Sequence, residues 1–184
     1  MLESIVDQMT VYQASWWVAG GWAIDLHLGR QHRPHKDVDL AVLRGDQGML
    51  QSSFREWSLH KVVNGTFESW RPNESLELPI HDVHVTRREE RLEFLLNEAY
   101  GDTWSFRRNL NVSMPLMNLT RYSSENIPYL CPEIVLLYKA KSPSAFDDED
   151  FERARSVLDT TAKQWLADAL NVCHPGHPWI CDLG

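Results

Sequence analysis

Residues 16–43 read WWVAGGWAIDLHLGRQHRPHKDVDLAVL, and this stretch decides the fold. The run from Trp16 to Ala19 has the apolar character of a short buried strand, which a pair of glycines interrupts. The next segment, 22–28, is typical of a helix that ends at Gly29. From residue 37 to 43 the side chains alternate in a period of two, which predicts a second strand. The stretch therefore predicts a strand, a Gly-Gly turn, a helix, a basic return loop and a strand.

Two carboxylates stand on one face of the second predicted strand. Asp37 and Asp39 are separated by one residue, so their side chains point the same way, about 7 Å apart. This spacing allows both to share divalent cations, which prefer oxygen ligands. Gly20-Gly21 lies sixteen residues upstream, where backbone N–H groups at a helix start can approach a phosphate. Together, the two motifs predict a phosphate cradle beside a metal-binding pair.

Periodicity and turn chemistry predict the remaining elements. An amphipathic helix opens the chain, and the segment after Asp46 is expected to form a helix capped by that residue. Residues 65–77 are polar and turn-rich, which indicates a loop or a ragged hairpin. The other expected elements are strands at 59–63 and 78–86, and helices at 46–57, at 133–141, from Asp147 or Asp148 onward, and at 161–172.

Length and composition favour one domain, or a compact core with a small helical appendage. The chain has 184 residues, 43% of them hydrophobic, which suits a folded core. We expect a core at 1–130 and a C-terminal helical segment at 131–184. No run approaches the roughly 18 apolar residues of a membrane span, and no signal-peptide pattern is present. The three cysteines form no C-x-x-C pair, which favours a reducing cytoplasm.

The charge balance and the C-terminal tail bear on ligands. A formal net charge of −8 argues against a nucleic-acid partner and suits a cationic small molecule, or a nucleotide whose charge is carried by metal ions. A zinc site is considered for the cysteines and histidines near the C-terminus, but their spacing fits no common zinc-finger pattern. These residues are Cys173, His174, His177 and Cys181. We expect instead a tail packed through Trp179.

The Gly-Gly and D-x-D motifs also carry a family resemblance. The segment Ala19-Gly20-Gly21-Trp22-Ala23-Ile24-Asp25, then Gly29-Arg30, then His35-Lys36-Asp37-Val38-Asp39, resembles the nucleotidyltransferase superfamily related to DNA polymerase β. Within it, the chain is most similar to lincosamide nucleotidyltransferases and aminoglycoside 2''-adenylyltransferases. The resemblance continues at 132–139 and 147–151. It departs at Gly21, where the broader superfamily usually has a serine hydroxyl.

This resemblance implies a fold and a reaction. The fold would be α+β, a polymerase β-like core with a mixed sheet flanked by helices and a short C-terminal helical segment. A substrate hydroxyl would attack the α-phosphorus of a nucleoside triphosphate and release pyrophosphate. Two Mg²⁺ ions would be held by Asp37, Asp39 and a third carboxylate, for which the segment Asp82-Val83-His84 is the match. Asp82 is also the candidate general base.

Other residues are expected to have supporting roles. Gly20, Gly21, Arg30 and Lys139 are expected to bind the triphosphate. His35 has two open readings, a hydrogen bond that holds the loop or a phosphate contact. Asp25 is expected to pair locally with Arg30 or Arg33. The acidic run 147–150 either begins a helix or attracts a cationic substrate.

The expected function is Mg-dependent transfer of a nucleoside monophosphate, with AMP expected, to a small hydroxylated acceptor such as an aminoglycoside or lincosamide antibiotic. Two alternatives stay open at this point. One is a toxin-type nucleotidyltransferase that acts on tRNA or protein. The other is a nucleotide-binding module without turnover, which would not need three carboxylates. A homodimer that completes the site is also left open.

Overall fold

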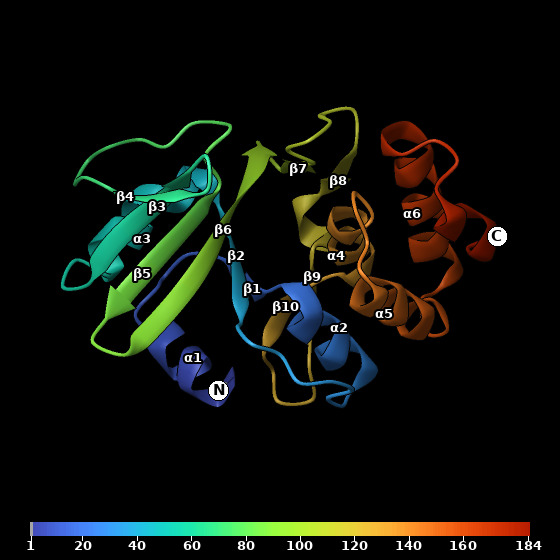
Figure 1. Ribbon diagram of the computed structural model, residues 1–184, viewed down its shortest axis with the longest axis horizontal. Helices are drawn as coiled ribbons and strands as arrows, with labels where there is room; N and C mark the ends of the chain where they lie inside the picture. The colour runs from blue at the N-terminus through green and yellow to red at the C-terminus, as the bar shows by residue number, and fades with distance from the viewer. Residues whose placement is uncertain (1) are drawn as a thin grey trace.

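The computed structural model describes residues 2–184, in which a mixed sheet is flanked by helices (Figure 1). The helices are α1 (Leu2–Met9), α2 (Gly20–Leu28), α3 (Gln47–Ser53), α4 (Pro132–Lys139), α5 (Ala145–Arg155) and α6 (Thr160–Cys173), with short 3-10 turns η1 (Arg44–Asp46), η2 (Leu116–Asn118) and η3 (Pro178–Asp182). The strands are β1 (Trp16–Val18), β2 (Asp39–Leu43), β3 (Ser58–Val63), β4 (Thr66–Ser69), β5 (Asp82–Arg87), β6 (Glu90–Tyr100), β7 (Thr103–Ser105), β8 (Ser113–Pro115), β9 (Thr120–Tyr122) and β10 (Pro128–Leu130).

The main sheet has the strand order β4-β3-β5-β6-β2-β1-β10-β9, with β7 and β8 attached to β6. The pairs β2–β6 and β1–β10 are parallel, and the others are antiparallel. Strands β3–β5 lie at one end of the molecule and helices α5 and α6 at the other (Figure 1). This arrangement confirms the predicted α+β fold with a mixed sheet. No helix within residues 2–184 combines the length and apolarity that a membrane crossing requires.

Strand register brings separated parts of the sequence together. Asp39 at the start of β2 is the parallel partner of Glu93 on β6, and His84 on β5 is the antiparallel partner of the same residue. Because side chains alternate along a strand, Asp82 projects from the same face of β5 as His84. The strand β6 thus separates β5 from β2, so Asp82 reaches toward Asp39 across an intervening strand.

The strand, helix, loop and strand predicted for residues 16–43 are confirmed, with two shifts at their boundaries. The glycine pair is not a turn before the helix, because α2 begins at Gly20 itself and ends at Gly29 in the left-handed conformation (φ 70°). The strand begins at Asp39, so Asp37 lies just before it. The predicted helix 46–57 was too long: η1 and the seven-residue α3 replace it, and the side chain of Asp46 forms no cap hydrogen bond.

Several later predictions also required correction. The predicted strand 78–86 begins only at Asp82, because a turn in which Ile80 N donates to Glu77 O (3.0 Å) precedes it. The hairpin at 65–77 is confirmed by the pairing of β4 with β3. The eleven-residue β6 was not predicted, since its start is concealed in a charged run.

The C-terminal helices form where expected, and side-chain caps mark the starts of α5 and α6. Ser144 rather than an aspartate caps α5, and its capping box with Asp147 begins the helix two residues early. The tail is anchored by Trp179, which is buried and stacks on Phe151 with ring centroids 4.4 Å apart. Within residues 2–184 the tail cysteines and histidines form no cluster that could hold a metal ion.

Candidate active site

The start of α2 and the start of β2 meet through a residue that must lack a side chain. Gly20 has φ 59°, and a Cβ atom at this position would overlap Asp39 Oδ2. The hydrogen bond from Ala19 N to Asp39 O (2.8 Å) joins the same two segments. A Cβ on Gly21 would overlap Arg33 and His35 in the return loop. Gly20 therefore allows the helix start to pack against the carboxylate of Asp39, and Gly21 allows it to pack against the return loop.

Four carboxylates influence one another at this end of the sheet. Burial, followed by the charge of Asp37, raises the pKa of Asp39 to about 6, although Lys139 partly offsets the rise. Burial and the charges of Asp39, Asp82 and Asp37 raise the pKa of Glu93 to about 7. The cluster thus holds more negative charge than its protein surroundings neutralise. Such uncompensated oxygen donors are the chemistry that a divalent cation prefers.

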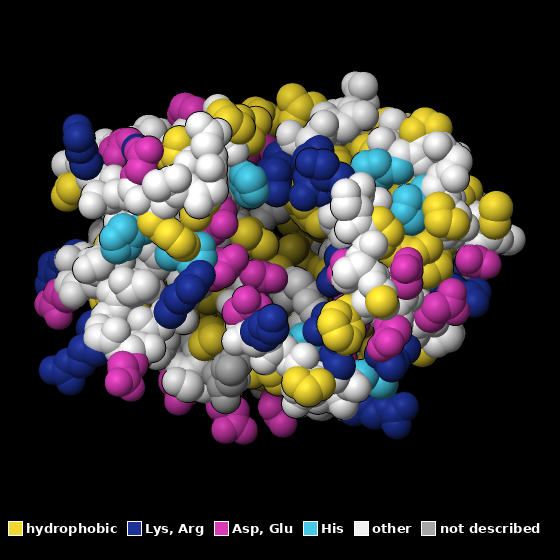
Figure 2. Space-filling model, in the orientation of Figure 1, with side chains coloured by type: hydrophobic (Ala, Val, Ile, Leu, Met, Phe, Trp, Pro, Cys, Tyr) yellow, Lys and Arg dark blue, Asp and Glu magenta, His cyan; other side chains and the backbone are white. Residues whose placement is uncertain are grey.

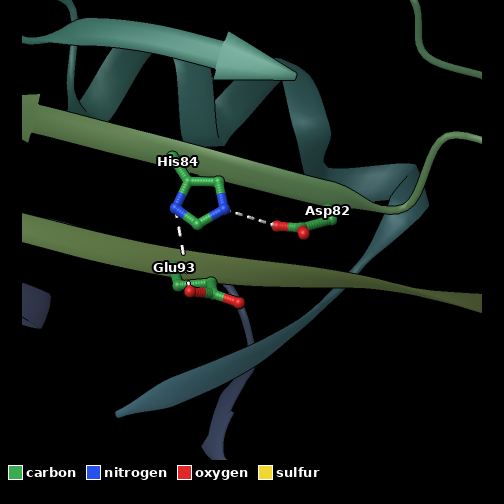
Figure 3. A group of neighbouring side chains, drawn as sticks. All are labelled: Asp82, His84 and Glu93. Carbon is green, nitrogen blue, oxygen red and sulfur yellow. Dashed lines mark ion pairs between the residues drawn. The ribbon is translucent and has the colours of Figure 1, made fainter. Parts of the chain in front are cut away.

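His84 fixes the position of the third carboxylate (Figure 3). This buried imidazole lies with Nε2 3.0 Å from Asp82 Oδ1, and with Nδ1 3.7 Å from Glu93 Oε2. Arg91 Nε donates to Nδ1 at 3.0 Å, so the ring proton is assigned to Nε2, where it can point at Asp82. Burial is the largest influence on the pKa of His84 and lowers it, which favours the neutral ring. The neutral imidazole of His84 therefore lies in close contact with both Asp82 and Glu93.

The return loop is held by an imidazole–carboxylate contact. His35 Nε2 lies 2.6 Å from Asp25 Oδ2, which supports the reading of His35 as a structural hydrogen-bonding residue. His32 approaches the other oxygen of Asp25 at 3.3 Å. The prediction that Asp25 pairs with Arg30 or Arg33 was wrong, because its hydrogen bond is to His35 and its second neighbour is His32, while the two arginines donate elsewhere.

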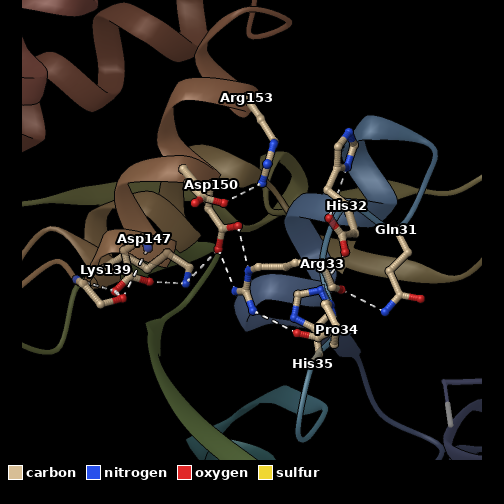
Figure 4. A network of polar contacts seen from close by, with 12 residues as sticks. Gln31, His32, Arg33, Pro34, His35, Lys139, Asp147, Asp150 and Arg153 are labelled. Atoms are coloured by element: carbon tan, nitrogen blue, oxygen red, sulfur yellow. Dashed lines mark hydrogen bonds and ion pairs between the residues drawn. The ribbon is translucent and has the colours of Figure 1, made fainter.

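The two arginines of the loop have other partners. Arg33 donates from Nε and Nη2 to Asp150 at 3.1 and 2.9 Å, which ties the loop to α5 (Figure 4). Arg30 is exposed and donates to His32 at 2.9 Å. It follows the C-terminal end of α2, about 13 Å along the helix from Gly20. The structure therefore does not bring Arg30 to the glycine pair.

Lys139 lies at the site but is already engaged. Its Nζ is 2.5 Å from Asp147 and 3.2 Å from the buried Asp150 (Figure 4). It also lines the cavity that contains Gly20 and Asp39. The acidic run thus begins a helix, as one of its two readings expected, and it also fixes this lysine in place.

A cavity of 220 Å³ opens beside Asp39. Its floor follows β2 and β6, and α4 and the loop after β7 form its walls. Figure 2 shows a hollow in the middle of one face, with acidic side chains on one margin and Lys and Arg side chains on another. A larger open groove of 1060 Å³ lies elsewhere, beside Arg44 and Glu98, and none of the four clustered carboxylates lines it. The lining residues of the smaller cavity are Ala19, Gly20, Asp39, Ala41, Leu95, Leu96, Asn97, Arg107, Arg108, Leu130, Val135, Tyr138 and Lys139.

Sequence reasoning missed three residues of this site. Glu93 joins the carboxylates only because β6 pairs with both β2 and β5. The alternation of Glu93, Leu95 and Asn97 along one face was the signal that could have revealed it. Arg107 and Arg108 lie in a loop without a recognisable motif, so only the structure brings them to the cavity.

A glycine-initiated helix packs against the D-x-D segment, with further carboxylates on β5 and β6, and the family whose model matches this chain makes it a nucleotidyltransferase. The family model described as aminoglycoside-2''-adenylyltransferase matches residues 1–133. The chain belongs to this family.

Solved structures share the fold at low sequence identity. The solution structure of the antibiotic-resistance factor ANT(2'')-Ia is 16% identical, with a TM-score of 0.61 over 93% of this chain and 89% of that one. ANT(2'')-Ia in complex with adenylyl-2''-tobramycin is 17% identical, with a TM-score of 0.61 over 93% and 95% of the two chains. The lincomycin-bound lincosamide antibiotic adenylyltransferase LnuA is 17% identical, with a TM-score of 0.57 over 85% and 96%. A comparison with curated proteins found no match.

Proposed function

We propose that this protein transfers a nucleoside monophosphate, with AMP as the expected group, from a nucleoside triphosphate to a hydroxyl of an aminoglycoside or lincosamide antibiotic. The observation that carries the proposal is the cluster of carboxylates that meets the glycine-initiated start of α2. One element supplies backbone N–H groups suited to phosphate, and the other supplies oxygen donors suited to cations. Both lie at Asp39, where Gly20 permits contact.

The donor set fits a pair of Mg²⁺ ions. Asp37, Asp39 and Asp82 would hold them, and Glu93 adds a fourth carboxylate beside Asp39. Burial is the main cause of the raised pKa of Asp39, and the neighbouring negative charge of Asp37 adds to it; bound cations would offset that charge. When bound, two such ions offset the charge on the phosphates and on the attacking and leaving oxygens.

Other groups at the site would bind the phosphates and remove the proton of the acceptor hydroxyl. The N–H groups at Gly20 and Gly21 would hold phosphate oxygens at the positive end of α2. Lys139 adds a cationic group whose position Asp147 and Asp150 fix. Asp82 is the proposed general base, and the N–H of His84 would keep its carboxylate turned toward the site.

The proposed acceptor class comes from the neighbours in fold. One contains adenylyl-2''-tobramycin and another contains lincomycin, so a hydroxyl of an amino sugar or of a lincosamide is the first acceptor to test. The formal charge of −8 suits a cationic acceptor. The boundary at residue 131, a cytoplasmic location and a homodimer remain predictions.

A label-transfer assay tests this function. The protein is incubated with Mg²⁺ and α-labelled ATP, GTP, CTP or UTP, each with aminoglycosides, lincosamides, tRNA or no acceptor. We expect labelled antibiotic together with stoichiometric pyrophosphate, and loss of both with Asp37→Asn. Arg71→Gln, which changes an exposed residue outside the cavity, is the matched control. Label on tRNA or on protein alone would assign a different acceptor, and triphosphate binding without any product would make the protein a binding module.

A further inference from the structure

Two adjacent arginines border the cavity from a loop that the proposed chemistry does not use. Arg107 and Arg108 follow β7, between the buried residues Phe106 and Val112. Hydrogen bonds from Phe106 N to Val112 O (2.8 Å) and from Val112 N to Asn109 O (3.0 Å) close the base of this loop. The pair is therefore presented on a short, anchored segment.

Neither guanidinium group has an acidic partner. Among residues 2–184, no carboxylate oxygen lies within 4.0 Å of a nitrogen of Arg107 or Arg108. Arg107 is half-buried, and burial is the first cause that lowers its pKa. The neighbouring cations Arg108 and Arg44 lower this pKa further, and Glu98, which raises it, has the smallest effect of the charges near the group. A partly desolvated cation without a counter-ion indicates a place for an anion.

Contacts with α4 orient both groups. Arg108 Nη1 donates to Tyr138 O at 2.8 Å, near the C-terminal end of the helix. The guanidinium carbons of Arg107 and Arg108 lie 5.3 and 5.2 Å from the centre of the Tyr138 ring. These contacts restrict the two side chains while leaving donors without acceptors, since each guanidinium carries five N–H groups.

The rest of the cavity limits what the anion can be. Arg107 and Arg108 share the cavity with Asp39 and Gly20, where the transferred phosphate would lie. Lys139 is already paired with two aspartates, so the arginine pair is the larger source of uncompensated positive charge on this wall. A cationic acceptor would be repelled from it. A chain of phosphates that begins near Asp39 would be attracted along the cavity toward it.

We propose that Arg107 and Arg108 form a polyphosphate subsite, which holds the β- and γ-phosphates of the nucleotide and then the pyrophosphate that leaves. This rests on the proposed function. Guanidinium groups match phosphate oxygens with paired N–H donors, and they retain their charge where a lysine could lose it. During transfer the bond from the α-phosphorus to the bridging oxygen breaks, and the negative charge that develops on the departing pyrophosphate falls beside these two cations. The subsite also keeps a cationic acceptor on the carboxylate side.

The test is titration calorimetry with MgPPi, the magnesium complex of inorganic pyrophosphate, and separately with AMP. We expect Arg107→Gln and Arg108→Gln each to weaken pyrophosphate binding by about 10- to 100-fold, because each removes charge-assisted hydrogen bonds. AMP binding should change little, and Arg71→Gln should bind both ligands normally. Arg107→Lys should be intermediate, since it keeps the charge and loses the paired geometry. Arg108 is exposed, so its variant is expected to fold, and thermal unfolding checks each protein.

The outcomes separate this subsite from the enzyme activity. Normal pyrophosphate binding by both glutamine variants, in a protein that transfers nucleotide, would overturn the subsite and leave the proposed function intact. Weakened AMP binding with normal pyrophosphate binding would place the nucleoside at the arginines and also overturn it. If the unmodified protein bound neither pyrophosphate nor any nucleoside triphosphate, the subsite and the proposed function would both fail.

Discussion

Replacing Asp39 by asparagine should stabilise the metal-free protein while it abolishes activity. The carboxylate lies against the start of α2 among three other acidic side chains. Asparagine has nearly the same shape but no charge, so it removes the repulsion and most of the desolvation cost. The same change removes an expected ligand for the catalytic cations. Stability and activity should therefore change in opposite directions.

The size of this effect follows from the pKa of Asp39. The folded protein raises it from 3.8 to about 6, so the folded state binds this proton more tightly than the unfolded state does. The resulting destabilisation is absent below the unfolded pKa and develops as the pH rises through the folded one. It reaches about 1.5 kcal/mol at pH 5 and about 3 kcal/mol at pH 8. For a chain of this length, 3 kcal/mol corresponds to roughly 6–12 °C in Tm.

Differential scanning calorimetry with a chelator present measures this shift. The Tm of Asp39→Asn should exceed that of the unmodified protein by several degrees at pH 8. At pH 5 the difference in Tm should be about half as large. Asp37→Asn is the comparison variant: Asp37 is exposed and its charge is only the second cause of the raised pKa of Asp39, so its removal should raise Tm by a smaller margin while still eliminating turnover. An unchanged or lower Tm for Asp39→Asn at pH 8 would refute the electrostatic account of the cluster.

Three further predictions concern the residues that hold α2, the return loop and the C-terminal tail in place. Gly20→Ala should lower both stability and activity severely, because its Cβ would overlap the carboxylate of Asp39. Gly29→Ala, also at positive φ but in open space, should cost only about 1 kcal/mol and leave turnover intact. Denaturant unfolding and the transfer assay compare the two variants. Arg33→Ala should destabilise the fold by about 1.5–3 kcal/mol, because it removes the charge-assisted hydrogen bonds to the buried Asp150 and leaves Lys139 as the remaining cationic partner. A loss no larger than that for Arg153→Ala, a surface i,i+4 pair worth below about 1 kcal/mol, would contradict this reading. Trp179→Ala should cost about 3–5 kcal/mol and expose the end of α5 to hydrogen exchange, and native-like protection there would show that the tail does not anchor the helix.

The central pair of carboxylates was predictable because its signals are local. The alternating sequence predicts Asp37 and Asp39 on one side of a strand, although the strand itself begins only at Asp39, and the glycine pair stands one helix and one loop upstream. Both signals lie within one stretch of 28 residues. The same holds for the capped C-terminal helices, whose ends are marked by serine, aspartate and proline.

The remainder of the site depends on contacts between distant segments. Glu93 is one acidic residue in a charged run until the register of β6 places it beside Asp39. Asp25 has nearby arginines in sequence, but the loop folds so that two histidines reach it instead. Arg107 reaches the cavity only through the pairing of β7 with β6. Such partner choices are settled by tertiary packing, which no local pattern encodes.

The most direct test of the central claim is the rate of Mg²⁺-dependent pyrophosphate release with an antibiotic acceptor, compared between the unmodified protein and Asp37→Asn. We expect release coupled one-to-one to adenylylated or otherwise nucleotidylated product, with a loss of at least about 100-fold in the variant and a Tm no lower than that of the unmodified protein. Full turnover by the variant would contradict the assignment of Asp37 and its neighbours as the catalytic cation site.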